Sequence, residues 1–172
     1  MSDISSPCEH LHDVHYFTAK DVDKRLNAAK EQCRANGVRF TPLRQQIYEL
    51  ILQANKPVGA YDLITQLQQK RLSAEGDKET VKNVAPPTVY RSLEFLLSEG
   101  LIHQLTSINA YVPCCHPRAQ HTAAFLICED CQRVQECSSL PVQEMMSFAQ
   151  QDVGFIVARS VIELSGRCQA CQ

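Results

Sequence analysis

Apolar side chains in the first half of the chain recur every three or four positions, which is the spacing of amphipathic helices. This pattern predicts four helices that begin at Val22, Pro42, Tyr61 and Pro86. Thr41 can accept a hydrogen bond from a free amide at the start of the second helix, and Gly37 and Gly100 end the first and the fourth. Two short strands, 101–105 and 110–112, follow the fourth helix. Helices that end in a small hairpin predict a winged helix-turn-helix.

The second half of the chain has a different period. Residues 122–127 and 133–136 are predicted as strands, 142–151 as a helix and 155–164 as a third strand. Together they make a β-β-α-β module of about 60 residues, a size at which an apolar core is marginal for independent stability. Such a module needs a metal, a partner subunit or both. The expected fold class is α+β, with a winged-helix part followed by a small α/β part.

Charge is distributed unevenly, although the net charge of the 172-residue chain is only −2. Between Lys20 and Lys56 there are eight basic and four acidic residues, whereas from Ala110 onward there are four basic and six acidic ones. A basic first half and a mildly acidic second half indicate two modules with different tasks. The chain shows neither an apolar run of membrane-spanning length nor a secretory leader, so we expect neither a membrane protein nor a secreted one.

Nine cysteines are an unusual number for such a chain. Cys128 and Cys131 form one pair and Cys168 and Cys171 another, each with two residues between its members. A two-residue gap lets both thiolates of a turn face one ion, and zinc takes four such ligands tetrahedrally. Disulfides or a thioredoxin-like redox pair are the alternatives. Two matched pairs outside a strand-to-helix turn favour structural zinc.

The remaining candidate metal ligands lie around the junction of the two halves. They are His103, Cys114, Cys115, His116, His121 and Glu136. A closed coordination sphere of nitrogen, sulfur and oxygen donors is suitable for zinc. Taken one at a time, such histidines are more often polar surface residues, so residue types alone leave this second site open.

Three segments complete the pattern: Arg39–Arg44 (RFTPLR), Ala60–Leu63 (AYDL) and Pro86–Leu93 (PPTVYRSL). With His121 and the cysteine pairs, they resemble the ferric uptake regulator family over roughly residues 22–171. Within that family, His103, Asn109–Val112 and Cys114 are most similar to the zinc-uptake regulator branch. The resemblance implies a cytoplasmic bacterial homodimer that binds operator DNA when it is loaded with zinc and represses zinc-uptake genes.

The resemblance also assigns residues, with two zinc ions per subunit. The ligands of the structural ion are Cys128, Cys131, Cys168 and Cys171. The ligands of the regulatory ion are His103, Cys114, His121 and Glu136. A recognition helix at 88–99 reads DNA, and the implied DNA contacts are Tyr61, Thr88, Tyr90 and Arg91. Two dimers on one operator remain an alternative to a single dimer.

The corresponding domain division has four parts. They are a flexible tail at 1–19, a winged-helix DNA-binding domain at 20–108, a hinge or linker at 109–120, and a dimerisation and metal-binding domain at 121–172. Residues 70–85 are predicted as a long polar loop, either a solvated insertion or a further contact to DNA phosphates. Arg44 and Lys56 are also candidate phosphate contacts.

Some assignments stay open at this stage. Cys115 or His116 can replace Cys114 as a ligand, because the spacing from Cys114 to His121 is one residue shorter than we expect for the branch. An auxiliary metal site in the tail is an alternative to simple disorder, and its ligands would be Cys8, His10, His12 and His15.

Two rival functions must be weighed. A sibling sensor of iron or peroxide is the alternative regulator, but the soft thiolate of Cys114 favours zinc over ferrous iron. An enzyme is not expected, because the chain contains neither a His-Glu-x-x-His motif, nor a zinc-deaminase signature, nor a phosphate loop. We therefore expect neither a small-molecule substrate nor a membrane partner.

Overall fold

The computed structural model of the chain describes residues 12–13, 17–75, 84–117, 123–137, 140–157 and 160–172. The chain divides into two compact units. We call residues 15–118 the helical unit, and residues 1–14 together with 119–172 the sheet unit. In the described residues, we find no helix with the length and apolar character that crossing a membrane requires.

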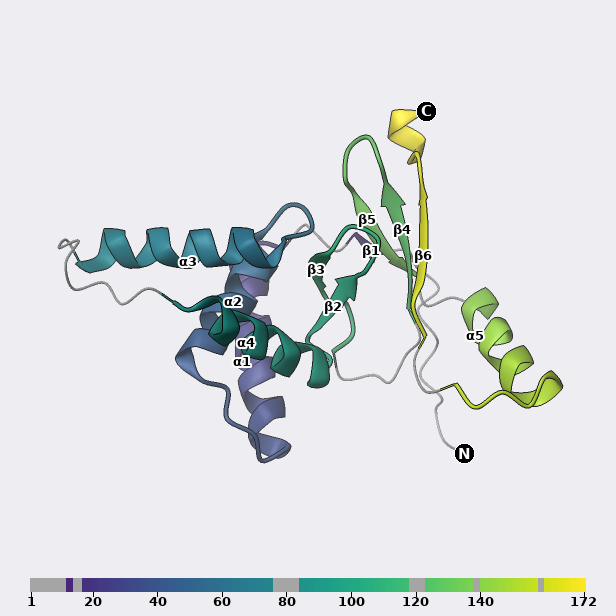
Figure 1. Cartoon of the computed structure of the whole chain (residues 1–172), viewed down its shortest axis with the longest axis horizontal. Helices are drawn as coiled ribbons and strands as arrows, with labels where there is room; N and C mark the ends of the chain where they lie inside the picture. Colours follow the sequence, from purple (N-terminus) through teal and green to yellow (C-terminus); the bar gives the residue numbers. More distant parts are fainter. Residues whose placement is uncertain (1–11, 14–16, 76–83, 118–122, 138–139, 158–159) are drawn as a thin grey trace. The chain divides into compact units, whose positions relative to one another are not determined.

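Four helices and a hairpin make up the described part of the helical unit (Figure 1). In chain order they are α1 (Ala19–Ala35), α2 (Pro42–Gln53), α3 (Ala60–Glu75), α4 (Pro86–Ser98), β2 (Ile102–Leu105) and β3 (Ala110–Pro113). The Thr41 side chain accepts a hydrogen bond from the backbone N–H of Arg44, so the predicted cap of α2 is confirmed. Gly37 and Gly100 have φ values of +70° and +65°, a left-handed conformation that glycine adopts without strain as a helix ends.

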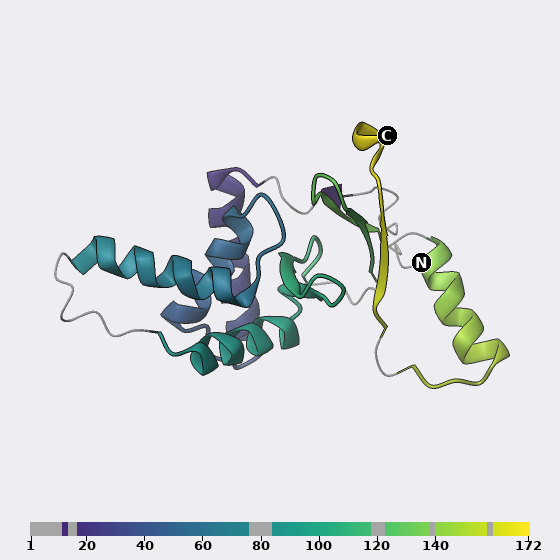
Figure 2. The same ribbon diagram turned by 45° about the horizontal axis from the view of Figure 1, so that its top comes forward.

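The apolar faces of these helices meet in one core, and α2 contacts α1, α3, α4 and β3 (Figures 1 and 2). Many of the largest fully buried side chains of the core lie on the predicted apolar stripes of α2, α3 and α4, whereas Tyr48 and Leu52 are buried outside them. Those on the stripes include Ile47, Ile51, Leu63, Leu67, Leu93 and Leu96. Each such side chain contributes roughly 1.5–3 kcal/mol when it is fully buried, so this core is the main source of stability of the helical unit.

The hairpin that follows α4 has a third participant. Strands β2 and β3 pair antiparallel, with His103 opposite Val112. Val58, in the segment before α3, donates its N–H to the Tyr111 carbonyl over 3.1 Å and accepts the Tyr111 N–H over 2.9 Å. The residue pattern could not predict this bridge, because one bridging residue has no periodicity. These two hydrogen bonds hold the segment before α3 against the β2–β3 hairpin, which we call the wing.

The described part of the sheet unit is a small mixed sheet with the helix α5, which a π-helical turn, Phe148–Asp152, extends (Figure 1). Its elements are β1 (His12–Asp13), β4 (Ala124–Cys128), β5 (Val134–Cys137), α5 (Leu140–Ser147) and β6 (Ile162–Gly166). The strand order is β1-β5-β4-β6, with β4 antiparallel to β5 and parallel to β6. A parallel pair needs a crossover connection, and α5 lies in that connection. Elements β4, β5, α5 and β6 confirm the predicted β-β-α-β order.

Several predicted limits are wrong. Helix α3 continues to Glu75, six residues beyond its predicted end, because helix-forming residues follow Gln69 without a glycine or proline. The last strand begins at Ile162 instead of residue 155. Strand β3 ends at Pro113, one residue beyond the predicted strand 110–112, because Pro113 pairs with Ile102 of β2. Residues 76–83, the rest of the predicted polar loop, lie outside the described residues.

The predicted flexible tail contains ordered pieces. His12 and Asp13 pair antiparallel with Glu136 and Gln135 of β5. Helix α1 begins at Ala19, three residues before its predicted start, because Thr18 and Asp21 form a reciprocal capping box ahead of the first apolar position. Strand pairing of this kind needs a distant partner, so no local pattern announces it. Three members of the predicted auxiliary metal site, Cys8, His10 and His15, lie outside the described residues.

Candidate metal centres and nucleic-acid interface

The four paired cysteines converge at one end of the sheet unit. Their sulfur atoms all lie within 4.8 Å of one another, and the Sγ atoms of Cys131 and Cys168 are 3.7 Å apart. A tetrahedral ion with Zn–S bonds of about 2.3 Å separates its sulfur ligands by about 3.8 Å. The four thiols therefore match a zinc site in both residue type and spacing. Cys128, Cys131, Cys168 and Cys171 form no disulfide in the structure, which does not support the disulfide alternative for these four.

Both halves of this cluster are held by backbone hydrogen bonds. In the turn after β4, the Cys128 N–H donates to the Arg133 carbonyl over 2.9 Å, and Gln132 adopts a φ of +59° as the chain reverses. The Glu129 N–H donates to the Gly166 carbonyl over 2.9 Å and ties that turn to the end of β6. The parallel pairing of β4 with β6 thus brings together cysteines that are far apart in sequence.

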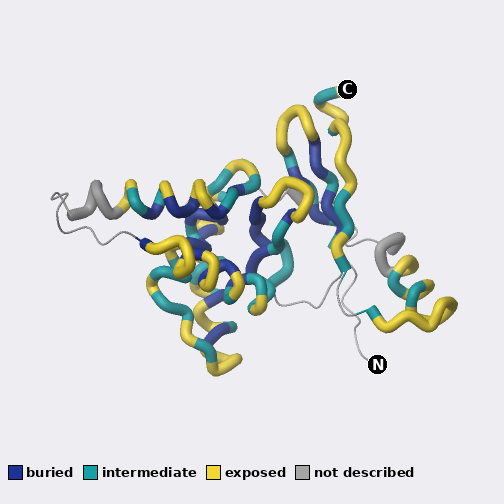
Figure 3. Tube along the Cα trace, viewed as in Figure 1, coloured by how far each residue is buried: buried dark blue, intermediate teal, exposed yellow. Residues whose placement is uncertain are grey.

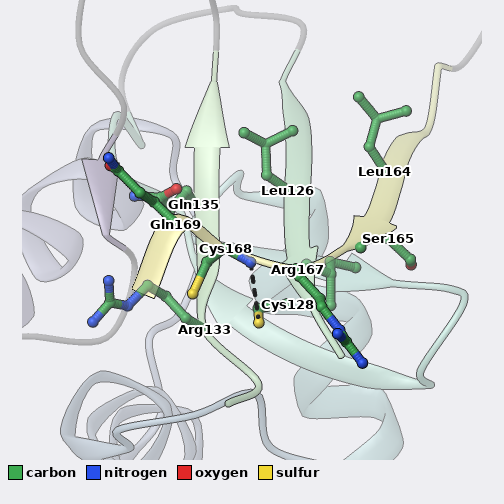
Figure 4. Close-up of a pocket in the computed structure, with 11 residues that line it drawn as sticks. Leu126, Cys128, Arg133, Gln135, Leu164, Ser165, Arg167, Cys168 and Gln169 are labelled. Carbon is green, nitrogen blue, oxygen red and sulfur yellow. Dashed lines mark hydrogen bonds between the residues drawn. The ribbon is translucent and has the colours of Figure 1, made fainter. Parts of the chain in front are cut away.

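The electrostatics of the cluster favour a bound cation. Backbone N–H groups of Cys131 and Cys168 donate to the Cys128 sulfur, and they lower the pKa of its thiol to about 6. The Cys168 bond is 3.4 Å long and is drawn in Figure 4. Hydrogen bonds with the thiols of Cys168 and Cys131 raise the pKa of Cys171 to about 12. Thiols this close cannot all ionise unless a cation offsets their repulsion, and a divalent ion supplies that charge.

A pocket of about 340 Å³ adjoins the cluster (Figure 4). Cys128 and Cys168 line it beside Leu126 and Leu164, whose strands β4 and β6 pair at these positions. This pocket is a hollow on the sheet next to the sulfur atoms, and it contains no nucleophile–base pair for catalysis.

Part of the second predicted metal site lies at the base of the wing. The ligand atoms of His103 on β2 and Cys114, directly after β3, lie within 4.8 Å of each other. Cys114 is buried, with 1% of its surface exposed, whereas Cys115 and His116 are half-buried. Within the helical unit, Cys114 is thus the cysteine that accompanies His103.

The other two predicted ligands belong to the sheet unit. Glu136 lies on β5 and is buried, and it stands opposite Phe125 of β4. His121 lies outside the described residues. The four-residue regulatory site therefore stays a prediction, and only the His103–Cys114 pair is placed within one unit.

The backbone around Cys114 has a partner that sequence analysis missed. Arg25 of α1 donates from its guanidinium to the Cys114 carbonyl over 2.8 Å and to the Cys115 carbonyl over 3.3 Å. Its Cζ atom also lies 4.2 Å from the centroid of the Phe17 ring. Arg25 and Cys114 are 89 residues apart, and an arginine on an amphipathic helix carries no signal of such a contact.

The predicted DNA contacts are on exposed surfaces. Thr88, Tyr90 and Arg91 are exposed on α4, on the side away from the buried Val89 and Leu93. Tyr61, at the start of α3, has 75% of its surface exposed. Tyr90 is thus not the core-facing aromatic that a helical stripe also permits.

Arg44 is not a simple surface cation. Its guanidinium lies 3.6 Å from the centroid of the Phe95 ring and donates to the Arg39 carbonyl. Cation–π contact of this kind holds α2 against α4. Arg44 therefore supports the position of α4, and its contact with a DNA phosphate stays a prediction.

The ferric uptake regulator family model matches residues 35–165 of the chain. The chain belongs to the ferric uptake regulator family. Members of this family are transcription regulators and not enzymes, which confirms the expectation that the chain is not an enzyme.

The chain is similar to individual members of the family to different extents. The zinc uptake regulation protein of Escherichia coli (strain K12) is 35% identical over 147 residues, which cover 85% of this chain and 80% of that protein. The peroxide operon regulator of Bacillus subtilis (strain 168) is 28% identical over 146 residues, which cover 85% of this chain and 92% of that protein.

A solved structure of a zinc uptake regulator complexed with zinc and DNA resembles this fold with a TM-score of 0.75. The sequence identity is 34%, and the match covers 90% of this chain and 96% of that chain. The α+β fold class, with a winged-helix part and a small α/β part, is thereby confirmed.

Proposed function

We propose that this chain is a zinc-responsive transcriptional repressor that binds operator DNA as a zinc-loaded homodimer and represses zinc-uptake genes. The observation that carries the proposal is the soft thiol of Cys114 beside His103, at the base of the wing that follows α4. Similarity to the zinc uptake regulation protein and to the zinc- and DNA-bound structure supports the same metal and the same partner.

Two zinc ions per subunit are part of this proposal. Cys128, Cys131, Cys168 and Cys171 would hold a structural ion that fastens the end of the chain to the turn after β4. His103, Cys114, His121 and Glu136 would hold a regulatory ion. Bound zinc supplies a positive charge and a tetrahedral preference that mixed nitrogen, sulfur and oxygen donors satisfy.

The regulatory ligands are divided between the two units, which gives them a mechanical role. His103 and Cys114 belong to the helical unit, whereas His121 and Glu136 belong to the sheet unit. When the four ligands share one ion, the two units keep one relative orientation. In a dimer that orientation sets the separation of the two α4 helices, which must match half-sites about one or more DNA turns apart. Without the shared ion, the separation of the two α4 helices varies, so fewer dimers match the spacing of the half-sites.

The exposed face of α4 supports the DNA partner. Arg91 offers a planar fork that can bond the O6 and N7 atoms of guanine, and Tyr90 offers a ring that can pack on a thymine methyl group. We also propose that Thr88 at the start of α4 and Tyr61 at the start of α3 contact the DNA. A regulator that reads chromosomal operators in this way works in the cytoplasm.

The surface of the sheet unit supports the homodimer. Large apolar side chains are exposed there, which is a property of interaction surfaces. They include Met145, Phe148, Phe155, Ile156 and Leu164. A second copy of the same surface would cover them symmetrically. Whether one dimer or two occupy an operator is decided by the length of DNA that the zinc-loaded protein protects.

The decisive experiment is a zinc titration of operator binding. A wild-type dimer selects its operator from a random duplex pool, and fluorescence anisotropy then follows binding as free zinc is buffered upward. Cys114→Ser should keep its fold and its structural zinc, but lose the zinc-dependent gain in affinity, which is roughly 5–150-fold for couplings of this kind.

The adjacent thiol provides the matched control. Cys115→Ser should titrate like the wild type, because Cys115 is only half-buried and Cys114 is the thiol beside His103. If Cys114→Ser retains full zinc dependence while Cys115→Ser or His116→Ala loses it, the ligand assignment is wrong. If iron(II) or manganese(II) alone produces the gain in the wild type, the chain is the sibling iron or peroxide sensor instead.

A further inference from the structure

Arg25 lies on α1, a helix that supplies none of the proposed metal ligands. Its side chain nevertheless donates hydrogen bonds to the backbone of Cys114 and Cys115, which we call the Cys114 loop. Its two guanidinium nitrogens donate to consecutive carbonyl oxygens, at 2.8 Å for Cys114 and 3.3 Å for Cys115. The side chain is half-buried, and the Phe17 ring stacks against it at 4.2 Å. A planar fork held on one side by an aromatic ring has little freedom to turn away.

The backbone of Cys114 is consequently held on both sides of its Cα atom. Its N–H donates to the Leu101 carbonyl over 3.0 Å, and its carbonyl accepts from Arg25. Leu101 is the residue directly after Gly100, where α4 ends. Fixing the peptide groups on both sides of Cys114 fixes the direction of its Cα–Cβ bond, and the Cys114 sulfur is then limited to the staggered positions about that bond.

The same helix also bonds to the end of the recognition helix. Gln32 donates to the Glu99 carbonyl over 2.7 Å, and Asn36 donates to the Glu99 carboxylate over 2.8 Å. Glu99 is the C-terminal cap of α4. Arg25 and Gln32 are seven residues apart, about 10 Å along one face of α1. One rigid helix thus contacts both the Cys114 loop and the end of α4.

We propose that Arg25 is a positioning residue of the regulatory metal site, and that α1 links the Cys114 loop to α4 through it. This inference rests on the proposed function. Hydrogen-bond partners behind metal ligands typically change metal affinity by 10–100-fold when they are removed. Arg25 is such a partner, and it acts through the backbone of the ligand instead of through its side chain.

Two substitutions of Arg25 separate the effect of its positive charge from the effect of its planar guanidinium group. Lysine keeps the positive charge but has no planar fork, so Arg25→Lys cannot donate to two consecutive carbonyls in the same way. Arg25→Ala removes both the positive charge and the planar fork. Lys30→Ala is the matched control, because Lys30 is an exposed cation of the same helix.

The experiment measures the free-zinc concentration at half-maximal operator binding for the wild type and the three variants, with the structural zinc retained in each. We expect Arg25→Ala and Arg25→Lys to raise that midpoint by about 10–100-fold and Lys30→Ala to leave it unchanged. Cobalt(II) added to the regulatory site should also give a d–d spectrum in Arg25→Ala that differs from the wild type. A merely structural loss would lower the melting temperature of the zinc-free protein without moving the midpoint.

The possible outcomes are distinguishable. A wild-type midpoint in both Arg25 variants overturns the positioning role, and the proposed function stands if Cys114→Ser still abolishes the zinc response. Full recovery by Arg25→Lys also overturns it, because charge alone would then suffice. Operator binding by the wild type that ignores zinc overturns the proposed function and this inference together.

Discussion

The helical unit and the sheet unit bury apolar surface to very different extents. Every buried residue of the main core cluster belongs to the helical unit, whereas the sheet unit buries few large apolar side chains, such as Phe125 and Ile127 (Figure 3). Of the large apolar side chains that are exposed in the described residues, most lie in the sheet unit, and Tyr61, Tyr90 and Ile108 are those of the helical unit. The helical unit therefore has a sufficient core of its own, whereas we propose that an ion and a partner subunit stabilise the sheet unit.

The largest effect that distinguishes the units is expected at the cysteine cluster. Cys168→Ser removes one of four ligands, and structural zinc contributes apparent binding free energies of about 10–16 kcal/mol in zinc-finger peptides. We expect the sheet unit to lose its structure and the protein to lose its dimer, while the helical unit still melts cooperatively. Limited proteolysis measures the loss of structure, sedimentation velocity the loss of the dimer, and thermal melting followed by circular dichroism the cooperativity of the helical unit. Zinc content is measured beside them.

Cys137→Ser is the control for that variant, because Cys137 lies on β5 but is not a member of the cluster. It should keep one structural zinc and the dimer. A Cys168→Ser dimer that contains no zinc and resists protease in its sheet unit would show that the unit is stable without metal, and the comparison between the units would fail.

The second effect, smaller, concerns the core of the helical unit. Leu93 is 1% exposed on α4, and truncation of such a leucine to alanine leaves a cavity that costs about 2–5 kcal/mol. Leu93→Ala should therefore lower the denaturant midpoint of the helical unit without changing zinc content. Lys30→Ala, at an exposed position, should change stability by no more than about 0.5 kcal/mol. Loss of zinc from Leu93→Ala would mean that the two units do not unfold independently.

The third effect appears only at high pH. Burial raises the pKa of Tyr48 from its ordinary value of 10 to about 12, because the phenolate is poorly solvated in the core. A raised pKa of an acid means that the folded state keeps its proton longer than the unfolded state does. The resulting stability, about 2–3 kcal/mol, is complete below pH 10 and is lost as pH rises from 10 to 12.

Tyr48→Phe keeps the ring and removes the titrating hydroxyl, so it isolates this effect. The wild type should lose more stability than Tyr48→Phe between pH 10 and 12 when denaturant unfolding of the helical unit is measured. Equal losses would indicate that the hydroxyl reaches water in the folded state.

Local residue chemistry was sufficient for much of the fold. The spacing of apolar positions and the Thr41 cap predicted helix α2, and Gly100 marked the end of α4, because these interactions act within one turn of the chain. The cysteine cluster was predictable for a similar reason. A two-residue gap already defines half of a tetrahedral site, and the pairing of β4 with β6 then brings the two halves together. The helical period left open whether Tyr90 faces the core, and the structure places it on the exposed side of α4.

Long-range pairing was decided only in the tertiary structure. Pairing of His12 with Glu136, the Val58–Tyr111 bridge and the contact of Arg25 with Cys114 each join residues that are more than fifty positions apart. Such contacts form because other elements bring two backbones together, and a single polar residue on a helix or in a loop carries no periodic signal of its partner. The sequence by itself therefore predicted candidate metal ligands and candidate DNA contacts, and tertiary packing decided which neighbours hold those residues in place.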